Sequence, residues 1–457
     1  MTKGKPFPII IRFCVPVFLG SILQQIYNLA DAFIVRRFVG LDEMGAVLST
    51  GSLHFLVIGF VIGLTAGFSI PVSRSFGSGE ISEMRKRAAN AFYLSGIFAI
   101  ALTALTVVFI RQLLETMQTP AETINAAYRY IIVLFCGIPV IMAYQIMVAI
   151  LRALGDSKTP LYFLAISGLV NVFLDVLFIA VFNWGTAGAG WATVVSITFA
   201  DVLCLFHIKK NHLVLTFQKS ELKFCRKRSA ELIKNGVPMA LQFSITAVGS
   251  VIIQSAVNGF GAVVVSAIGT AARIQILIMQ PMEALGITMA TYCAQNLGAG
   301  KLHRIKKGIQ LSMTAVLIYS AFAGLLIIFA GRILAFFIIG LGETGADDVA
   351  NVEEALVYIK QFQLVNGSLY WLLGILFIVR NTIQGLGYSK VTVFAGISEL
   401  IARAGVAFIF VPFFGFNAIC FANPLAWLFA DILLIIVFIV LMKRLSKFSR
   451  HELKVKV

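Results

Sequence analysis

The chain has 457 residues, of which 59% are hydrophobic and only 13% are charged. Soluble domains are about 45–50% apolar and about 25% charged, so this composition excludes an ordinary soluble protein. It predicts instead a chain that crosses a membrane many times. The formal net charge of +16 is spread between apolar segments rather than gathered in one basic domain. This spread argues against a nucleic-acid partner.

Apolar segments long enough to cross a bilayer recur throughout the chain. We expect twelve transmembrane helices and therefore an all-α integral membrane fold, with both termini on the same side. The expected spans are residues 9–35, 45–72, 89–111, 127–151, 160–183, 187–208, 236–258, 262–290, 308–330, 355–379, 390–412 and 418–441. The six cysteines show no paired or metal-ligand spacing, so we expect neither a disulfide nor a cofactor.

The distribution of Lys and Arg gives the chain a predicted orientation. Of the 37 basic residues, 29 fall in one set of connecting segments and six in the other, while Arg273 and Arg403 are interpreted as the only bases inside spans. Basic segments favour the cytoplasmic side, which places both termini in the cytoplasm of a multi-pass protein of the inner (plasma) membrane. The basic runs are expected to contact anionic lipid.

The two halves of the sequence resemble each other. "VPVFLGSI" at Val15 is answered by "VPMALQFS" at Val237, and "ALGDSK" from Ala153 is answered by "GLGYSK" from Gly385. We expect an N-lobe at 1–208, a basic linker at 209–235, a C-lobe at 236–442 and a basic tail at 443–457. Two six-helix repeats of equal orientation predict lobes related by a pseudo-twofold axis along the membrane normal, which is typical of transporters.

A polar stripe follows one face of the first span. Gln24, Asn28 and Asp31 are spaced at i, i+4 and i+7, so they share a helix face. A carboxylate in the membrane is expected to face a protein interior or a water-filled cavity. Pro16 lies fifteen residues before Asp31 and predicts a bend in this helix.

Three further residues are expected at the depth of Asp31. Asn171 and Asp175 share a face of the fifth span, and Thr193 lies near the start of the sixth. Two carboxylates, an amide oxygen and a hydroxyl suit Na⁺. Close carboxylates in a dry site also suit H⁺, because both cannot ionise together. We therefore predict a cation-binding or coupling site, and leave the ion open.

Other charged residues within the spans receive structural roles or none. Glu399 and Arg403 are spaced at i, i+4 in the favourable order and predict a structural ion pair. Asp201 and Asp431 correspond in the repeat, so we expect them to share a role in stabilising or gating the lobes. Arg36, Arg273 and Glu283 receive no role.

Several segments together resemble the multidrug and toxic compound extrusion (MATE) family, in particular its prokaryotic DinF-like and related branches. They are "YNLADAFIVRRFVG", "LRALGDSKTP", "NVFLDVLFI" and "AQNLGAGKLHRIKKG". The resemblance implies twelve helices in two lobes, and export of organic, often cationic compounds in exchange for Na⁺ or H⁺. It also implies that Asp31, Asn171, Asp175 and Thr193 form the N-lobe cation site, that Pro16 bends helix 1, and that Gln24 and Tyr27 line a substrate cavity, to which we add Asn28.

The expected function is therefore multidrug antiport by alternating access, by a protein that is a monomer and not an enzyme. Its substrates would be small organic cations or other lipophilic drugs. The alternative is a flippase for lipid-linked precursors, which needs a cationic cavity for pyrophosphate. A membrane transferase would need an Asp-x-Asp motif or several membrane histidines, and neither occurs. A channel is harder to exclude, although no repeated selectivity filter is present.

Overall fold

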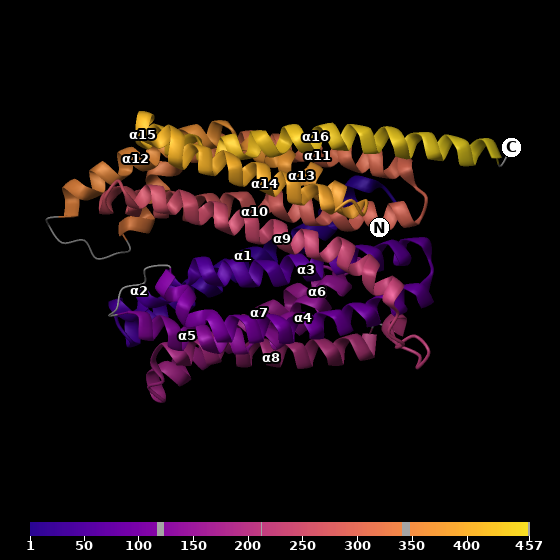
Figure 1. Ribbon diagram of the computed structural model, residues 1–457, viewed down its shortest axis with the longest axis horizontal. Coiled ribbons are helices and arrows are strands. Elements are labelled where there is room, and N and C mark those ends of the chain that lie inside the picture. The colour runs from indigo at the N-terminus through magenta and orange to yellow at the C-terminus, as the bar shows by residue number, and fades with distance from the viewer. Residues whose placement is uncertain (117–122, 212, 341–347, 456–457) are drawn as a thin grey trace. The chain divides into compact units, whose positions relative to one another are not determined.

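The structure is a computed structural model that describes residues 1–116, 123–211, 213–340 and 348–455 (Figure 1). Position 212 of the predicted linker and positions 456 and 457 of the predicted tail lie outside these residues. Within the described ranges the chain is almost entirely helical, and no strand occurs. This agrees with the requirement that a chain in lipid satisfies its backbone hydrogen bonds internally.

The first half of the chain runs from α1 to a short helix after α8. Its elements are α1 (Pro6–Phe38), α2 (Leu41–Ser49), α3 (Gly51–Ser78), α4 (Ile81–Thr116), α5 (Ile124–Cys136), α6 (Ile138–Ala153), α7 (Lys158–Asp175), the π-helix η1 (Val176–Val181), α8 (Gly185–Asn211) and the 3-10 helix η2 (Leu213–Leu215).

The second half repeats this order with long helices and a second π-helix. Its elements are α9 (Arg226–Asn258), α10 (Ala262–Gly298), α11 (Leu302–Gly340), α12 (Asp348–Ser368), α13 (Tyr370–Gly385), α14 (Lys390–Gly405), the π-helix η3 (Val406–Phe410), α15 (Val411–Phe414) and α16 (Phe416–Val455).

Ten described helices are individually long and apolar enough to cross a membrane, and two bent pairs supply the remaining spans. The helices α5 and α6 meet at 51°, and α12 and α13 meet at 50°. The predicted spans at 127–151 and 355–379 are therefore each broken. Pro139 lies in the first turn of α6, where its missing N–H does not interrupt that helix. With each bent pair counted as one span, the described residues supply the twelve transmembrane helices that the sequence predicted.

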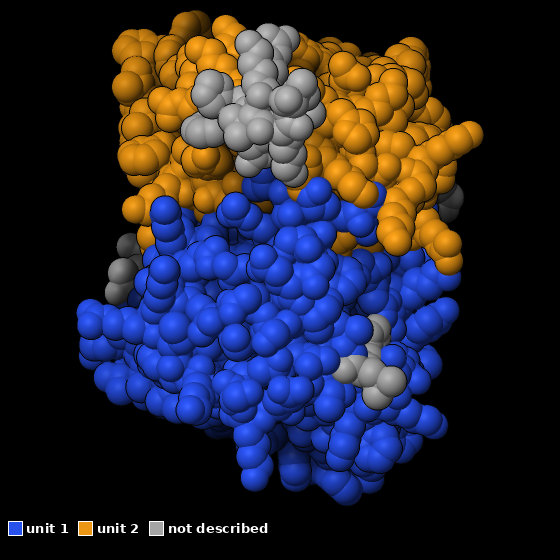
Figure 2. Space-filling model, turned by 90° about the vertical axis from the view of Figure 1, so that its right-hand side faces the viewer, with its two compact units in different colours: residues 1–2, 15–240, 297–299 blue, residues 3–14, 241–296, 300–457 orange. Residues whose placement is uncertain are grey.

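Contacts within the chain define two compact units, coloured in Figure 2. Unit 1 comprises residues 1–2, 15–240 and 297–299, and unit 2 comprises residues 3–14, 241–296 and 300–457. The first helix of each half is thus divided: the start of α1, up to Cys14, belongs to unit 2, and the start of α9, up to Ala240, belongs to unit 1. Pro16 and Pro238 lie within two residues of these divisions.

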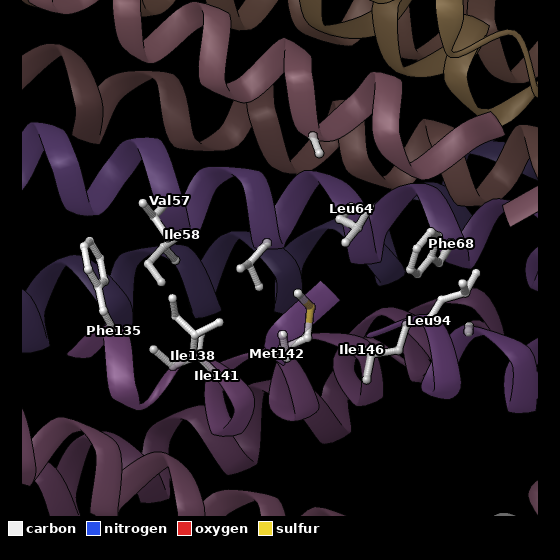
Figure 3. Packing of buried hydrophobic residues seen from close by; sticks show 14 of the residues in the cluster. Val57, Ile58, Leu64, Phe68, Leu94, Phe135, Ile138, Ile141, Met142 and Ile146 are labelled. Carbon is white, nitrogen blue, oxygen red and sulfur yellow. The ribbon is translucent and has the colours of Figure 1, made fainter. Parts of the chain in front are cut away.

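The core of unit 1 is formed where α3 packs against α4 and α6 (Figure 3). Leu64 and Phe68 of α3 are fully buried, and they lie on the same side of α3 as Val57. The helix α6 supplies Ile138 and Met142 to the same cluster. In unit 2, α14 packs against α16, while α11 packs against α12 and α13.

The end of the segment between α8 and α9 and the first turn of α9 are bound to the first turns of α4 within unit 1. Arg228 Nη2 donates to Glu83 Oε1 at 2.9 Å, and Asn90 Oδ1 accepts from the Cys225 amide at 2.8 Å and from Ser229 Oγ at 3.1 Å. Because α9 begins at Arg226, the last ten residues of the predicted linker are helical. The linker is therefore a packed part of unit 1.

Candidate functional site

The helix α1 approaches α7 locally, at two glycines of unit 1, near the first predicted residues. A Cβ placed on Gly168 of α7 would lie 3.8 Å from Tyr27 Cβ, and one on Gly20 of α1 would lie 3.6 Å from Leu164 Cδ2. Glycines at these positions let the two helices approach without a side chain between them. The α1 helix runs unbroken through Pro16, and the polar stripe continues from Gln24 to Asp31 along it.

Asp175 ends α7 and is completely buried, and Asn171 lies one turn before it and is 1% exposed. The chain then continues as the π-helix η1 rather than as a regular α-helix. Single π-helical turns often occur at functional sites, because the extra residue redirects neighbouring side chains. The sequence predicted the shared face of Asn171 and Asp175 but gave no sign of the π-helix.

The carboxyl groups of Asp31 and Asp175 lie within hydrogen-bonding reach of each other. Among the described residues, no donor reaches Asp31 Oδ1, either carboxylate oxygen of Asp175, or Asn171 Oδ1. Ionised carboxylates only accept hydrogen bonds, so neither member of the pair can donate one to the other when both are ionised. Buried acceptors without donors are costly, and a proton or a metal cation between them would remove that cost.

Thr193 completes the predicted set from α8, where it is 7% exposed. Its hydroxyl donates to the Ala189 carbonyl at 3.1 Å, and Asn171 Nδ2 lies 3.5 Å from the same hydroxyl oxygen. This contact turns the amide nitrogen of Asn171 toward α8. The structure therefore brings all four predicted residues into one lobe, contributed by α1, α7 and α8.

Two tyrosines lie within electrostatic range of the acid pair, and only one of them was expected. Tyr27 of α1 and Tyr130 of α5 both interact with Asp31 and Asp175. The sequence analysis did not identify Tyr130 as a neighbour of the acid pair. A tyrosine in an apolar span can face either lipid or protein, so the sequence does not indicate which side of the helix it occupies. A Cβ on Gly190 of α8 would lie 3.0 Å from the Tyr130 carbonyl oxygen, so this glycine allows α8 to approach α5.

The other two residues predicted to line a substrate cavity are solvent- or lipid-facing within unit 1. Gln24 and Asn28 are exposed, and Tyr27 is half-buried. Gln24 also lines a cavity of about 70 Å³ in this unit. Drug-sized ligands need about 300–1,000 Å³, so this cavity is not the site of a drug.

Unit 2 contains the predicted pair of Glu399 and Arg403, with an additional partner. Arg403 Nη1 lies 3.4 Å from Glu399 Oε2, and Arg380 of α13 also donates to Glu399. All three side chains are at least 93% buried. The interpretation of Arg380 as a base in a connecting segment was wrong: it lies inside α13, one residue beyond the end predicted for that span. Both arginines therefore share one carboxylate.

The repeat-related acids Asp201 and Asp431 are buried at 8% and 2% exposure. No donor among the described residues reaches Asp201 Oδ1 or either carboxylate oxygen of Asp431. Asp431 lies within electrostatic range of Arg380 and Glu399, and Asp201 lies within range of Tyr144. No described group of three or more His, Cys, Asp and Glu residues is arranged to hold a metal ion.

Ten to twelve transmembrane helices among the described residues, in two repeated halves with buried acids, are typical of a membrane transporter. Residues 16–177 and 238–409 match the MatE family model. The chain belongs to the MatE family, and it is a transporter and not an enzyme.

Relatives and solved structures agree with this assignment. The chain is 28% identical over 350 residues to the probable multidrug resistance protein YoeA of Bacillus subtilis, covering 74% of this chain and 76% of that protein. It is 32% identical over 311 residues to the probable multidrug resistance protein YpnP of the same organism, covering 66% and 68%. The fold is similar to the crystal structure of MATE in complex with MaL6, with a TM-score of 0.89, 19% identity and 98% of each chain covered.

Proposed function

We propose that the protein exports lipophilic, often cationic compounds from the cell in exchange for H⁺ or Na⁺, by alternating access. The observation that carries the proposal is the contact between the Asp31 and Asp175 carboxyl groups, whose buried oxygens lack donors among the described residues. Such a site binds a cation, and it needs no cofactor. The multidrug resistance names of YoeA and YpnP support drugs as the substrates.

Coupling follows if the bound cation and the drug favour different states of the transporter. A ligand shifts a conformational equilibrium by its difference in affinity for the two states. With the acid pair free of the coupling ion, its negative charge favours a cationic drug. Entry of H⁺ or Na⁺ from outside neutralises the pair and weakens that attraction, so the drug is released outward. All four site residues come from one unit of one chain, which supports a monomer in the plasma membrane.

The alternative of a lipid-linked precursor flippase has less support. It would need cationic side chains free to bind pyrophosphate inside the membrane. Arg380 and Arg403 of unit 2 are both buried and both contact Glu399. Their charge is thus partly neutralised within the protein, and unit 1 offers acids at its site instead.

Proteoliposomes test the proposal directly. Ethidium efflux is measured with a pH gradient alone and with a Na⁺ gradient alone, for the wild type, Asp31→Asn and Asp175→Asn. We expect one gradient to drive efflux in the wild type and neither to drive it in the two variants. Glu221→Gln is the matched control, because it neutralises a buried carboxyl of the same unit outside the transmembrane helices. Undiminished efflux in both site variants would show that the acid pair has a structural role only.

A further inference from the structure

Unit 1 contains a polar cavity between α1, α6 and the start of α7. Its volume is about 70 Å³, which is too small for a drug but has room for several water molecules. The hydrogen-bonding side chains that line it are Gln24, Tyr144, Gln145, Arg152 and Ser157. A cavity with this many polar partners holds water, whereas an apolar cavity of the same size stays dry.

The corresponding place in unit 2 is filled by side chains. In the repeat, Gly20 corresponds to Gln242, Arg152 to Gln384, and Pro160 to Thr392. Gln384 Nε2 donates to Gln242 Oε1 at 2.7 Å, and it lies 3.3 Å from Thr392 Oγ1. In the second lobe these direct hydrogen bonds therefore fill the space that the first lobe leaves open beside Gly20. The cavity thus lies in the lobe that carries the acid pair, at a place that hydrogen-bonded side chains occupy in unit 2.

The cavity extends from the basic end of unit 1 toward the acid pair. Arg152 and Ser157 lie beside Lys158 at the end that the positive-inside rule assigns to the cytoplasm. At its other end the cavity reaches Leu164, one helical turn before Gly168, where Tyr27 packs. Tyr27 interacts in turn with Asp31 and Asp175. Along α1, Tyr27 thus lies between Gln24, which lines the cavity, and Asp31 of the acid pair.

We propose that this cavity holds a chain of water molecules through which the coupling proton passes between the acid pair and the cytoplasm. The inference rests on the proposed antiport and selects H⁺ as its ion. A proton leaves a carboxyl of the acid pair, passes by exchange along hydrogen bonds through Tyr27 and water, and enters the cytoplasm as hydrated H⁺. Only a proton can pass by exchange along such hydrogen bonds, because a metal cation would have to move bodily through the cavity.

The groups around the cavity agree with this role. Arg152 and Tyr144 of α6 line it, and Asp201 and Cys204 of α8 lie within electrostatic range of Tyr144. None of these side chains needs to bind the proton, because water carries it past them. The cavity is therefore a conducting site and not a second coupling site.

Filling the cavity tests the inference. Gly20→Gln introduces the side chain that unit 2 carries at the corresponding position, and Gly20→Ala is its control. A Cβ at position 20 would lie 3.6 Å from Leu164 Cδ2 and 3.9 Å from Leu161 Cδ1, so alanine fits without strain. We expect Gly20→Gln to slow ethidium efflux driven by a pH gradient about tenfold, which corresponds to a barrier higher by about 1.4 kcal/mol. Gly20→Ala should retain most of the rate.

Further readouts separate this inference from the proposed function. Ethidium affinity in detergent should be unchanged in Gly20→Gln, and thermal unfolding shows whether the variant folds. If it does not, Val148→Phe fills the same cavity from α6. A wild-type efflux rate in the filled variant overturns the inference. A loss of ethidium affinity as large as the loss of efflux rate also overturns it, because the cavity would then be a substrate subsite. Efflux driven by Na⁺ and not by H⁺ overturns it too, while leaving the antiport proposal intact.

Discussion

Arg403 of α14 occupies the position in the repeat that corresponds to Asn171 of α7. Arg403 follows Glu399 by four residues, just as Asn171 follows Ser167. In unit 1 this position contributes an amide oxygen that lacks a donor among the described residues, beside the acid pair. In unit 2 it contributes a guanidinium group that contacts Glu399 at 3.4 Å. A Cβ on Gly249 of α9 would lie 3.1 Å from Arg403 Nη1, so this glycine leaves room for the arginine. Unit 2 thus carries a fixed positive charge where unit 1 lacks one.

Removing Glu399 should destabilise the protein more than removing Arg403. Glu399→Gln leaves the buried guanidinium groups of Arg380 and Arg403 without their shared carboxylate, and breaking a buried pair in this way costs about 3–5 kcal/mol. Arg403→Gln leaves the contact between Arg380 and Glu399 in place, so we expect a loss of about 1–3 kcal/mol. Thermal unfolding in detergent measures both. Equal losses in the two variants would contradict the shared network.

Asp31→Asn should abolish coupling and yet stabilise the protein at alkaline pH. Once both carboxyls have lost their protons, the wild type holds two ionised carboxylates beside each other, and these repel. An amide at position 31 removes one charge and offers an N–H donor to Asp175, whose oxygens lack donors among the described residues. Melting temperatures at about pH 10.5 and about pH 5.5 test this, with Asp201→Asn as the control. A lower melting temperature for Asp31→Asn at both pH values would count against repulsion in the pair.

The sequence contained enough information to predict the helices and to place the acids on them, but not the contacts between helices. Periodicity and the depth of each span brought Asp31, Asn171, Asp175 and Thr193 to one level, because polar residues are rare in lipid and easily seen. Tyr130 and Arg380 were missed for different reasons. The face of Tyr130 depends on how α5 packs, and Arg380 lay one residue beyond a predicted end. The bends at the junctions of α5 with α6 and of α12 with α13 likewise depend on packing between helices.

Gly67→Ala should disrupt the crossing of α3 with the start of α9 inside unit 1. A Cβ at position 67 would lie 2.5 Å from Gly236 Cα and 2.7 Å from the Asn235 carbonyl oxygen, which are backbone atoms that cannot turn aside. Overpacking of this kind costs about 1–3 kcal/mol. Gly96→Ala in α4 is the control, because its Cβ would meet nothing within 4 Å and alanine favours a helix by up to about 1 kcal/mol. Equal melting temperatures for the two variants would refute the close crossing.

The linker on unit 1 should loosen as the pH falls, through Glu221. The backbone amide of Gln218 donates to Glu221 Oε2 at 2.9 Å, and with Ser82 and Arg85 it lowers the pKa of this carboxyl below its ordinary value of 4.5. A lowered pKa means that the folded linker favours the ionised form. The contribution of ionised Glu221 to the stability of the folded linker is therefore complete above pH 4.5, and it is lost as the pH falls through the folded-state pKa.

Hydrogen–deuterium exchange of residues 214–225, corrected for the intrinsic rate at each pH, measures this effect. Wild-type protection should decrease between pH 7 and about pH 3.5. Glu221→Gln should already have lost that protection at pH 7 and change little below it, because it has no carboxylate to protonate. Glu353→Gln is the control, since it alters an exposed pair with Arg332 in unit 2 and should leave the linker as it is. If Glu221→Gln kept wild-type protection at pH 7, the remaining contacts of the linker, such as those of Asn90 with Cys225 and Ser229, would be sufficient to hold it on α4.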